Sequence, residues 1–290
     1  MRLAVLSDIH SNSVALEACL NRSKELGVEG FLLLGDYISD CPSPTVTMEL
    51  LYQLKQKFPC WFVRGNREDY QLAHRNGVND QWCSPSSSSG SLLYTYRNLR
   101  EKDFRFFESL PVSQEIRLPD SRPFIICHGS PKSTKELLYP KSNRMKKALR
   151  ECVTELLFCG HTHLQGEDCC GSRRCINPGS VGVPEGSNGK AQFAIYDTLT
   201  EMVEFISQEY EVWKILENYE KSGLMKDAGV LGQFMPLQIA TGKNYLKKVV
   251  ILASEEMKRE CGIVVPGKIP EKYWQMAYKK VRENETEGSC

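Results

Sequence analysis

Five short apolar runs along the chain each lead into polar residues at their carboxyl ends. They are Leu3–His10, Gly30–Asp36, Cys60–Glu68, Phe124–Gly129 and Glu155–His163. The apolar part of each run is continuous rather than alternating, which is typical of strands covered on both faces. In open α/β sheets the loops after such strands converge on one crevice. The pattern therefore predicts a single site built from distant parts of the sequence.

Helical patterns separate the first three runs. Residues Ser13–Leu26 carry apolar positions behind a polar cap, and Gly27 follows as a stop signal. A second helix begins at Pro44 and ends before Pro59. The order β-α-β-α-β predicts parallel strands in the first half of the chain.

From Ser113 onward the pattern changes to strands, interrupted by one helix at Asn143–Arg150. A parallel first half and a strand-rich second half predict an α/β fold with two sheets stacked face to face and helices outside. We expect residues 1–208 to form this domain. The predicted strands are Gln114–Leu118, Phe124–Cys127, Glu155–Cys159, Gln165–Ile176, Gln192–Tyr196 and Met202–Gln208.

Residues 209–290 return to a helical pattern and form a predicted C-terminal extension. Its predicted helices are Val212–Lys221, Tyr245–Arg259 and Glu271–Val281. Such an extension is a candidate for a cap over the mouth of the site or for a homo-oligomer interface. We expect its aromatic side chains to pack rather than to stack on bases, because it has no basic stripe.

The polar segment Gly77–Ser91, with four consecutive serines before Gly90, predicts a mobile surface loop. A helix is predicted after it, from Leu92 to about Leu110.

Composition narrows the function classes. Apolar residues make up 41% of the 290 positions, enough for a sizeable core. With 37 basic and 36 acidic residues the net charge is +1, which argues against nucleic acid as a partner. The longest candidate for a membrane span, Val249–Ala253, is far too short. Several of the twelve cysteines lie in or beside predicted core strands, as expected for a cytoplasmic protein with free thiols.

The polar residues after the apolar runs are suitable metal ligands. A two-metal hydrolytic centre needs nitrogen and oxygen donors and a carboxylate that bridges both ions, and Asp36 is the natural bridge. Carboxylates with imidazoles and no thiolate favour Mn, Fe, Zn, Ni or Co over an all-oxygen Mg site. We therefore expect two divalent or trivalent ions. The seven predicted ligands are Asp8, His10, Asp36, Asn66, His128, His161 and His163.

In this chain order the pieces resemble the calcineurin-like metallophosphoesterase superfamily, whose blocks run D-x-H, GD, GN-H-D/E, H and G-H-x-H. Here they are Asp8-Ile9-His10, Gly35-Asp36, Gly65-Asn66-Arg67-Glu68, His128-Gly129 and Gly160-His161-Thr162-His163.

The resemblance implies a four-layer αββα sandwich of two mostly mixed sheets. It also implies hydrolysis of a phosphomonoester or phosphodiester by in-line attack of a metal-bridging hydroxide. The implied ligands of one metal are Asp8, His10, Asp36 and His163. Those of the other are Asp36, Asn66, His128 and His161.

Arg67 departs from the family pattern, which has histidine at this position. An arginine does not act as a general acid near neutral pH, but its planar fork suits phosphate oxygens. One interpretation places Arg67 and Asn66 on the substrate phosphate, with Asp36, Asn66, Arg67 and His128 as the catalytic set. The other directs Arg67 to solvent or pairs it with Glu68 or Asp69. His74, the spare histidine, is expected at the surface.

Two function classes follow from these residues. The first is a phosphatase or phosphodiesterase acting on a small phosphate ester. The second is a scaffold or regulatory protein of the same fold with weak or no catalysis. The seven retained ligands favour the enzyme, because a scaffold has no physical reason to gather so many costly polar groups. Arg67 is the feature that favours the scaffold.

Overall fold

The computed structural model describes residues 1–78, 81–119, 121–265 and 268–287. Its first sheet has the strand order β10-β9-β1-β2-β3. Strands β1, β2 and β3 run parallel, and β9 and β10 complete the sheet in antiparallel pairing. The bounds are β1 (Arg2–Leu6), β2 (Gly30–Leu33), β3 (Cys60–Phe62), β9 (Ala191–Asp197) and β10 (Val203–Gln208).

The second sheet has the order β4-β5-β6-β8-β7, with parallel β5, β6 and β8 between antiparallel edges. The strand pattern predicted over Gln165–Ile176 forms a hairpin of two strands, which turns at Gly171 with a φ of 65°. The bounds are β4 (Ser113–Ile116), β5 (Phe124–Cys127), β6 (Leu156–Phe158), β7 (Gly166–Cys170) and β8 (Arg173–Asn177).

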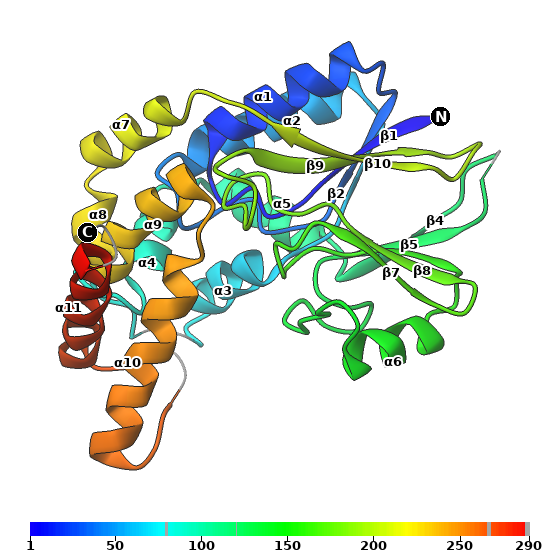
Figure 1. Cartoon of the computed structure of the whole chain (residues 1–290). Coiled ribbons are helices and arrows are strands. Elements are labelled where there is room, and N and C mark those ends of the chain that lie inside the picture. The colour runs from blue at the N-terminus through cyan, green and yellow to red at the C-terminus, as the bar shows by residue number, and fades with distance from the viewer. Residues whose placement is uncertain (79–80, 120, 266–267, 288–290) are drawn as a thin grey trace.

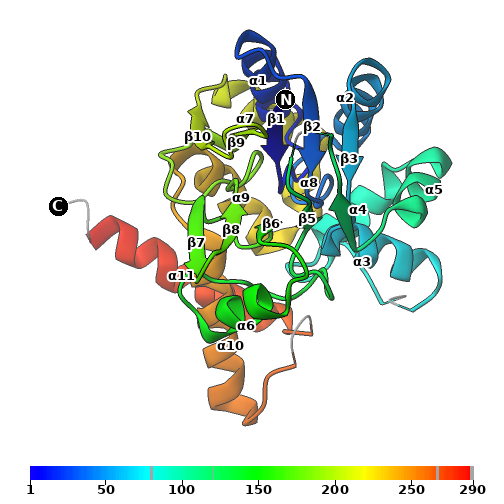
Figure 2. The same ribbon diagram turned by 90° about the vertical axis from the view of Figure 1, so that its right-hand side faces the viewer.

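The continuous apolar runs are explained by burial on both faces of each sheet. In β1, Leu3 and Val5 belong to the core between the sheets, whereas Ala4 and Leu6 belong to the core under the outer helices. Successive strand residues point to opposite faces, so both sets must be apolar. Figure 2 shows the two sheets one above the other.

Helices form the two outer layers. On the first sheet lie α1 (Ser13–Glu25) and α2 (Pro44–Lys57), and on the second lies α6 (Asn143–Glu151) (Figure 1). Met145 and Leu149 of α6 pack with Cys127 and Cys159 behind the second sheet. The predicted αββα sandwich of two mixed sheets is confirmed.

Three helices follow β3 at the end of the sandwich: α3 (Asn66–Arg75), α4 (Gly90–Arg97) and α5 (Glu101–Ser109). The single helix predicted from Leu92 to Leu110 is thus two. The second begins where the carboxylate of Asp103 accepts the N–H of Arg100 at 2.8 Å, a capping contact that favours a new helix start.

The serine-rich segment before α4 differs from the expected surface loop. Ser87 is buried, its hydroxyl donates to Glu271 at 2.7 Å, and it accepts the N–H of Val230 at 2.8 Å. The segment therefore packs against the C-terminal helices. Residues 79–80 of the predicted loop lie outside the described residues.

The C-terminal helices gather at the end of the sandwich opposite the N terminus (Figure 1). They are α7 (Val212–Ser222), α8 (Leu224–Asp227), α9 (Gly229–Thr241), α10 (Tyr245–Cys261) and α11 (Glu271–Glu287). A shared core joins α7, α8 and α9 to Cys41 and Val183 of the strand-end loops. Within the described ranges no helix is long and apolar enough to cross a membrane. The domain boundary after Gln208 stays a prediction.

Candidate metal centre

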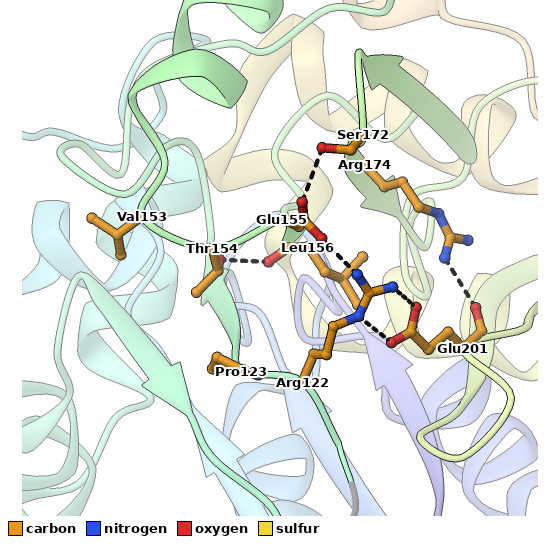
Figure 3. A pocket seen from close by; sticks show the side chains of 9 residues that line it. All are labelled: Arg122, Pro123, Val153, Thr154, Glu155, Leu156, Ser172, Arg174 and Glu201. Carbon is orange, nitrogen blue, oxygen red and sulfur yellow. Dashed lines mark hydrogen bonds and ion pairs between the residues drawn. The ribbon is translucent and has the colours of Figure 1, made fainter.

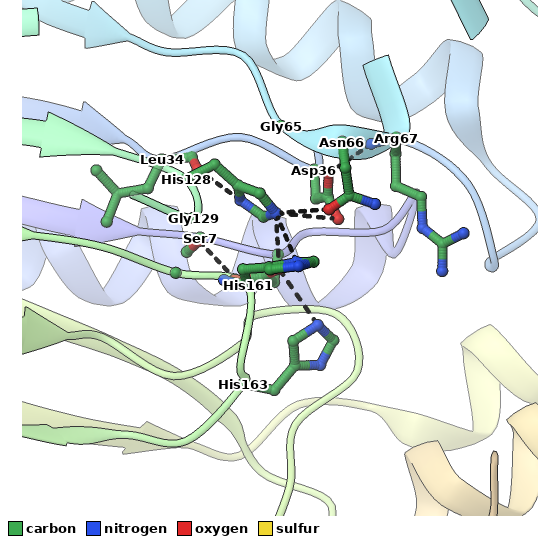
Figure 4. Close-up of polar contacts among 12 residues, drawn as sticks. Ser7, Leu34, Asp36, Gly65, Asn66, Arg67, His128, Gly129, His161 and His163 are labelled. Atoms are coloured by element: carbon green, nitrogen blue, oxygen red, sulfur yellow. Dashed lines mark hydrogen bonds and ion pairs between the residues drawn. The ribbon is translucent and has the colours of Figure 1, made fainter. Parts of the chain in front are cut away.

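The seven predicted ligands follow β1, β2, β3, β5 and β6, with Asn66 as the first residue of α3. Figure 4 shows how five of them lie: Asp36, Asn66, His128, His161 and His163. Six of the seven form two groups of three, and within each group the potential ligand atoms lie within 4.8 Å of one another. The groups are Asp8, His10 and His163, and Asp36, His128 and His161.

Left-handed backbone at five of these residues turns their side chains toward one point. The φ angles are 54° at Asp8, 50° at His10, 53° at Asp36, 65° at His161 and 58° at His163. Each such residue costs about 1–3 kcal/mol, so surrounding structure must hold it. Backbone bonds do so: Asp8 N–H donates to Gly35 at 3.1 Å, and His10 N–H donates to the carbonyl of Asp36 at 2.9 Å.

Two glycines of the sequence blocks are required by close approach. A Cβ at Gly65 would lie 2.2 Å from Asp36 Oδ1, and one at Gly160 would lie 1.9 Å from Ser7 Oγ. Real Cβ atoms do not come so close, so any other residue would displace the acidic side chains nearby. The glycines therefore bring the loops near enough to share ligands.

The outward-facing imidazole nitrogens have partners that fix the rings. His128 Nδ1 donates to the carbonyl of Leu34 at 2.9 Å, and His163 Nδ1 donates to that of Val183 at 2.7 Å. His10 Nδ1 lies 3.0 Å from Asp40 Oδ2. Such outer partners are typical of metal-binding histidines, because they set the tautomer and direct the other nitrogen inward.

The inward-facing nitrogens meet in pairs that need a proton or a metal ion between them. His10 Nε2 lies 3.2 Å from His163 Nε2, and His128 Nε2 lies 3.1 Å from His161 Nδ1. Two lone pairs at such distances repel unless a proton or a metal ion lies between them. Asp8 Oδ1, which is buried and has no hydrogen-bond partner, lies 3.2 Å from His163 Nε2. An orphaned anionic oxygen among imidazoles fits a metal cation.

Electrostatics at the centre favour anionic carboxylates. Burial works to raise the pKa of Asp36, but nearby His128 and His10 lower it to about 2. Burial works to lower the pKa of His128, which Asp36 and Asp8 raise to about 9. Burial lowers the pKa of His161 to about 4. Without metal, protonated imidazoles thus balance the buried acids, and cation binding would release those protons.

Asp36 lies where the two groups adjoin, and Asn66 lies beside the second group. Asp36 Oδ2 is 3.8 Å from His10 Nε2 in one group and 3.4 Å from His128 Nε2 in the other. Asn66 Oδ1 is 3.0 Å from His128 Nε2. These positions suit a bridging carboxylate and a neutral oxygen ligand, and both roles stay predictions.

Arg67 pairs with neither of the acids expected from sequence. Its Nη2 lies 2.8 Å from Asp40 Oδ2, while Asp69 pairs with Arg64 at 2.7 Å. Figure 4 shows the Arg67 guanidinium directed away from His128. Arg67 lines the cavity at the centre, and its buried Nε has no hydrogen-bond partner.

Sequence reasoning missed Asp40, whose Oδ2 contacts both His10 and Arg67. Its carbonyl accepts the hydroxyl of Tyr219 from α7 at 2.6 Å, and its Oδ1 accepts the hydroxyl of Ser91 at 3.1 Å. Burial works to raise the pKa of Asp40, but Arg67 and His10 hold it well below its usual range. A lone aspartate after a predicted strand gave no signal of these contacts.

Glu68 was also missed as a positioning residue. Its buried carboxylate accepts the backbone N–H groups of Asp36 at 3.0 Å, Tyr37 at 2.9 Å and Gly65 at 2.8 Å. It therefore ties the loop after β2 to the start of α3. Burial and the charge of Asp36 raise the pKa of Glu68 to about 7.

Other predicted features lie around the centre. The loop after β8 supports it from behind, since the hydroxyl of Ser180 donates to the carbonyl of Asp8 at 2.8 Å. The ring of His74 stacks on that of Trp82 with the centroids 4.2 Å apart, and His74 does not line the cavity.

The cysteines of the β7–β8 hairpin differ in burial. Cys169 is exposed, whereas Cys175 is buried with its Sγ 3.3 Å from that of the buried Cys159.

Two of the cavities lie at opposite ends of the strands. The one at the metal centre has a volume of about 280 Å³ and includes side chains from α9 and α10. The other, about 170 Å³, lies before β5 and β6 and is shown in Figure 3.

Comparison with known proteins gives the family. The model of the calcineurin-like phosphoesterase superfamily domain matches residues 1–201. The chain therefore belongs to this superfamily. An uncharacterised protein of Methanocaldococcus jannaschii is 28% identical over 242 residues, which are 77% of this chain and 93% of that protein.

Two solved structures share the fold. The crystal structure of a hypothetical protein from Pyrococcus horikoshii OT3 matches with a TM-score of 0.72 and 22% identity, over 83% of this chain and 98% of that one. That of a metallophosphoesterase from Sphaerobacter thermophilus matches with a TM-score of 0.66 and 24% identity, over 83% of this chain and 100% of that one. The shared fold thus covers more of the chain than residues 1–201.

Proposed function

We propose that the chain is a metal-dependent phosphoesterase that hydrolyses a small phosphomonoester or phosphodiester. The observation that carries this proposal is the orphaned Asp8 Oδ1 beside inward-facing imidazole nitrogens. The superfamily supports a hydrolase of this kind.

The residues present fit two metal ions. Asp8, His10 and His163 would hold one, and His128, His161 and Asn66 the other, with Asp36 shared. When bound, the ions would neutralise phosphate oxygens and lower the pKa of a water that attacks phosphorus in line with the leaving group.

The other residues would orient the ester. Arg67 would donate to phosphate oxygens, because its guanidinium lines the cavity and keeps a buried Nε without a partner. Asp40 would hold one side of that guanidinium, at 2.8 Å from Nη2. The neutral oxygen of Asn66 would serve both the metal and the substrate.

The alternative is a scaffold of the same fold. Arg67 in place of the usual histidine favours it, since arginine does not supply a proton to the leaving group. The buried carboxylates and imidazoles oppose it, since grouping them without a ligand is costly.

Hydrolysis of p-nitrophenyl phosphate and its bis-ester distinguishes the two. With Mn²⁺ added, we expect the native chain to hydrolyse at least one of them and Asp36→Asn to be more than about 100-fold slower, since even partners of metal ligands contribute about 10–100-fold. Asp197→Asn is the matched control, because Asp197 pairs with Arg2 at the far end of β1. No hydrolysis by the native chain with Mn, Fe, Zn, Ni or Co would favour the scaffold.

A further inference from the structure

The C-terminal helices supply one wall of the metal-centre cavity. Met235 and Gln238 of α9, and Leu246 and Lys247 of α10, line it together with the predicted ligands. The turn between these helices is fixed to the loop that follows β8, because the N–H of Gly186 donates to the carbonyl of Gly242 at 2.9 Å. The sandwich alone therefore does not define the space available to a substrate.

A third cavity, distinct from the one in Figure 3, continues this space along α10. It has a volume of about 380 Å³ and shares Asn244 and Lys247 with the cavity at the metal centre. We call it the α10 groove, and its lining residues are Asn244, Lys247, Lys248, Ile251 and Leu252. Their spacing of three and four places them on one face of the helix.

This face of α10 is partly open: Lys247, Lys248 and Ile251 are exposed, whereas Leu252 packs against the core of the C-terminal helices. The other side of the helix packs Val249, Ala253 and Met257 into the core of the C-terminal helices. Ile251 is 46% exposed and belongs to no core cluster of the described residues. An exposed isoleucine in a groove that adjoins a buried polar centre is a candidate contact for the organic part of a ligand.

Lys247 and Lys248 supply positive charge along the groove, while at the junction Asn244 Nδ2 donates to the carboxylate of Glu185. Within the described part of the chain, neither Lys247 nor Lys248 has an acid within ion-pair distance, and the groove lining contains none. Lys247 Nζ lies 5.6 Å from the ring centroid of Tyr139. Lysine stems also offer apolar surface beside their charged ends.

We propose that the substrate is a phosphate ester with an apolar leaving group, which lies in the α10 groove while the phosphoryl group lies at the metal centre. This inference rests on the proposed phosphoesterase function. The two adjoining cavities together reach the range of about 300–1,000 Å³ that is common for small-molecule sites. Lys247, at the junction, would face the ester near its negative charge.

A series of alkyl phosphates tests the groove. Phosphate release is measured with methyl, butyl and octyl phosphate, below the concentration at which octyl phosphate forms micelles. We expect kcat/KM to rise about twofold for each added methylene. Full burial of a methylene would give about fourfold, so a twofold rise corresponds to partial burial in the groove. Ile251→Ser should abolish most of this rise. Val250→Ser is the matched control, because Val250 is exposed on α10 but lines neither cavity.

Calorimetric binding of octylphosphonate to the Mn²⁺-loaded protein gives a readout independent of turnover. We expect the affinity to exceed that of methylphosphonate at least tenfold and to fall in Ile251→Ser. If p-nitrophenyl phosphate is hydrolysed but affinity and kcat/KM do not depend on chain length, the inference fails and the proposed function stands. If octylphosphonate binds through Ile251 but no ester is hydrolysed, the groove is supported and the proposed function fails.

Two further experiments identify what occupies the groove. Faster hydrolysis of hexadecyl phosphate in phosphatidylcholine vesicles than of monomeric octyl phosphate would support the groove and make a membrane the source of the ester. A second copy of the chain would compete for the same face. If Ile251→Ser turns a dimer into a monomer in light scattering, with unchanged chain-length dependence, the face is a subunit interface and the inference is overturned.

Discussion

The cavities at the two ends of the strands differ in how their charged groups are paired. At the far end, Arg122 lies 2.6 Å from Glu155 and also pairs with Glu201, and Arg174 donates to the carbonyl of Glu201 at 3.0 Å (Figure 3). At the metal end, Asp8 Oδ1 has imidazole nitrogens nearby but no hydrogen-bond partner. Charges that satisfy one another need no ligand, whereas an orphaned buried acceptor requires one. The comparison indicates which cavity is better suited to a cation.

Metal removal should produce the largest effect. Chelation followed by return of Mn²⁺ should change the midpoint of thermal unfolding by about 10 °C or more. Two sites saturated at 100 times Kd contribute about 5 kcal/mol, and about 2–4 °C per kcal/mol is usual for a domain of 150–250 residues. Calorimetric melting curves of the two states measure this shift.

Glu155→Gln is the control at the far cavity. This variant should show the same metal-dependent shift as the native chain, because its paired charges bind no cation. An unchanged melting temperature on chelation and reloading of the native chain would contradict the comparison.

Asp40→Asn should produce the next largest effect. It weakens the contact to His10 Nδ1 at 3.0 Å and the ion pair to Arg67 at 2.8 Å. Partners of metal ligands typically contribute about 10–100-fold to metal affinity or activity, so we expect a loss in that range. The Mn²⁺ concentration for half-maximal activity and the KM for p-nitrophenyl phosphate measure the two contacts separately.

Ser91→Ala provides the matched control for Asp40. It removes the hydroxyl that donates to Asp40 Oδ1 at 3.1 Å and accepts the N–H of Asp40 at 3.1 Å, but it leaves the carboxylate in place, so the loss should be severalfold smaller. Equal losses in both variants would mean that Asp40 acts only through packing of α4.

The sequence predicted the sandwich well because its signals are local. A strand buried on both faces needs an unbroken apolar run, as Leu3 to Leu6 provide. The predicted ligands could be named for the same reason, since Asp8 and His10 lie two residues apart in one turn. What no local pattern reveals is a partner such as Asp40, which meets Arg67 only after folding.

The C-terminal helices were harder to predict. Helix α9 has apolar residues on all sides and contains Gly232 and Pro236, so it shows neither an amphipathic period nor clean boundaries. Ser87 lies in a run of serines, a composition that favours an exposed loop, yet it is buried against α11. In both cases tertiary packing determines the structure and overrides the local preference of the sequence.

The smallest effect is expected at the far cavity. Glu201→Gln removes one charge of the pairs with Arg122, whose side chain is 63% exposed. Exposed ion pairs contribute about 0–1 kcal/mol, so the free energy of unfolding should fall by less than about 1 kcal/mol. Activity and Mn²⁺ dependence should not change, because the cavity lies beyond the other ends of the strands. Urea unfolding and assays on p-nitrophenyl phosphate check both points. A larger loss of activity than in Asp40→Asn would show that the two ends of the sandwich are coupled, and that paired charges at the far end are more than structural.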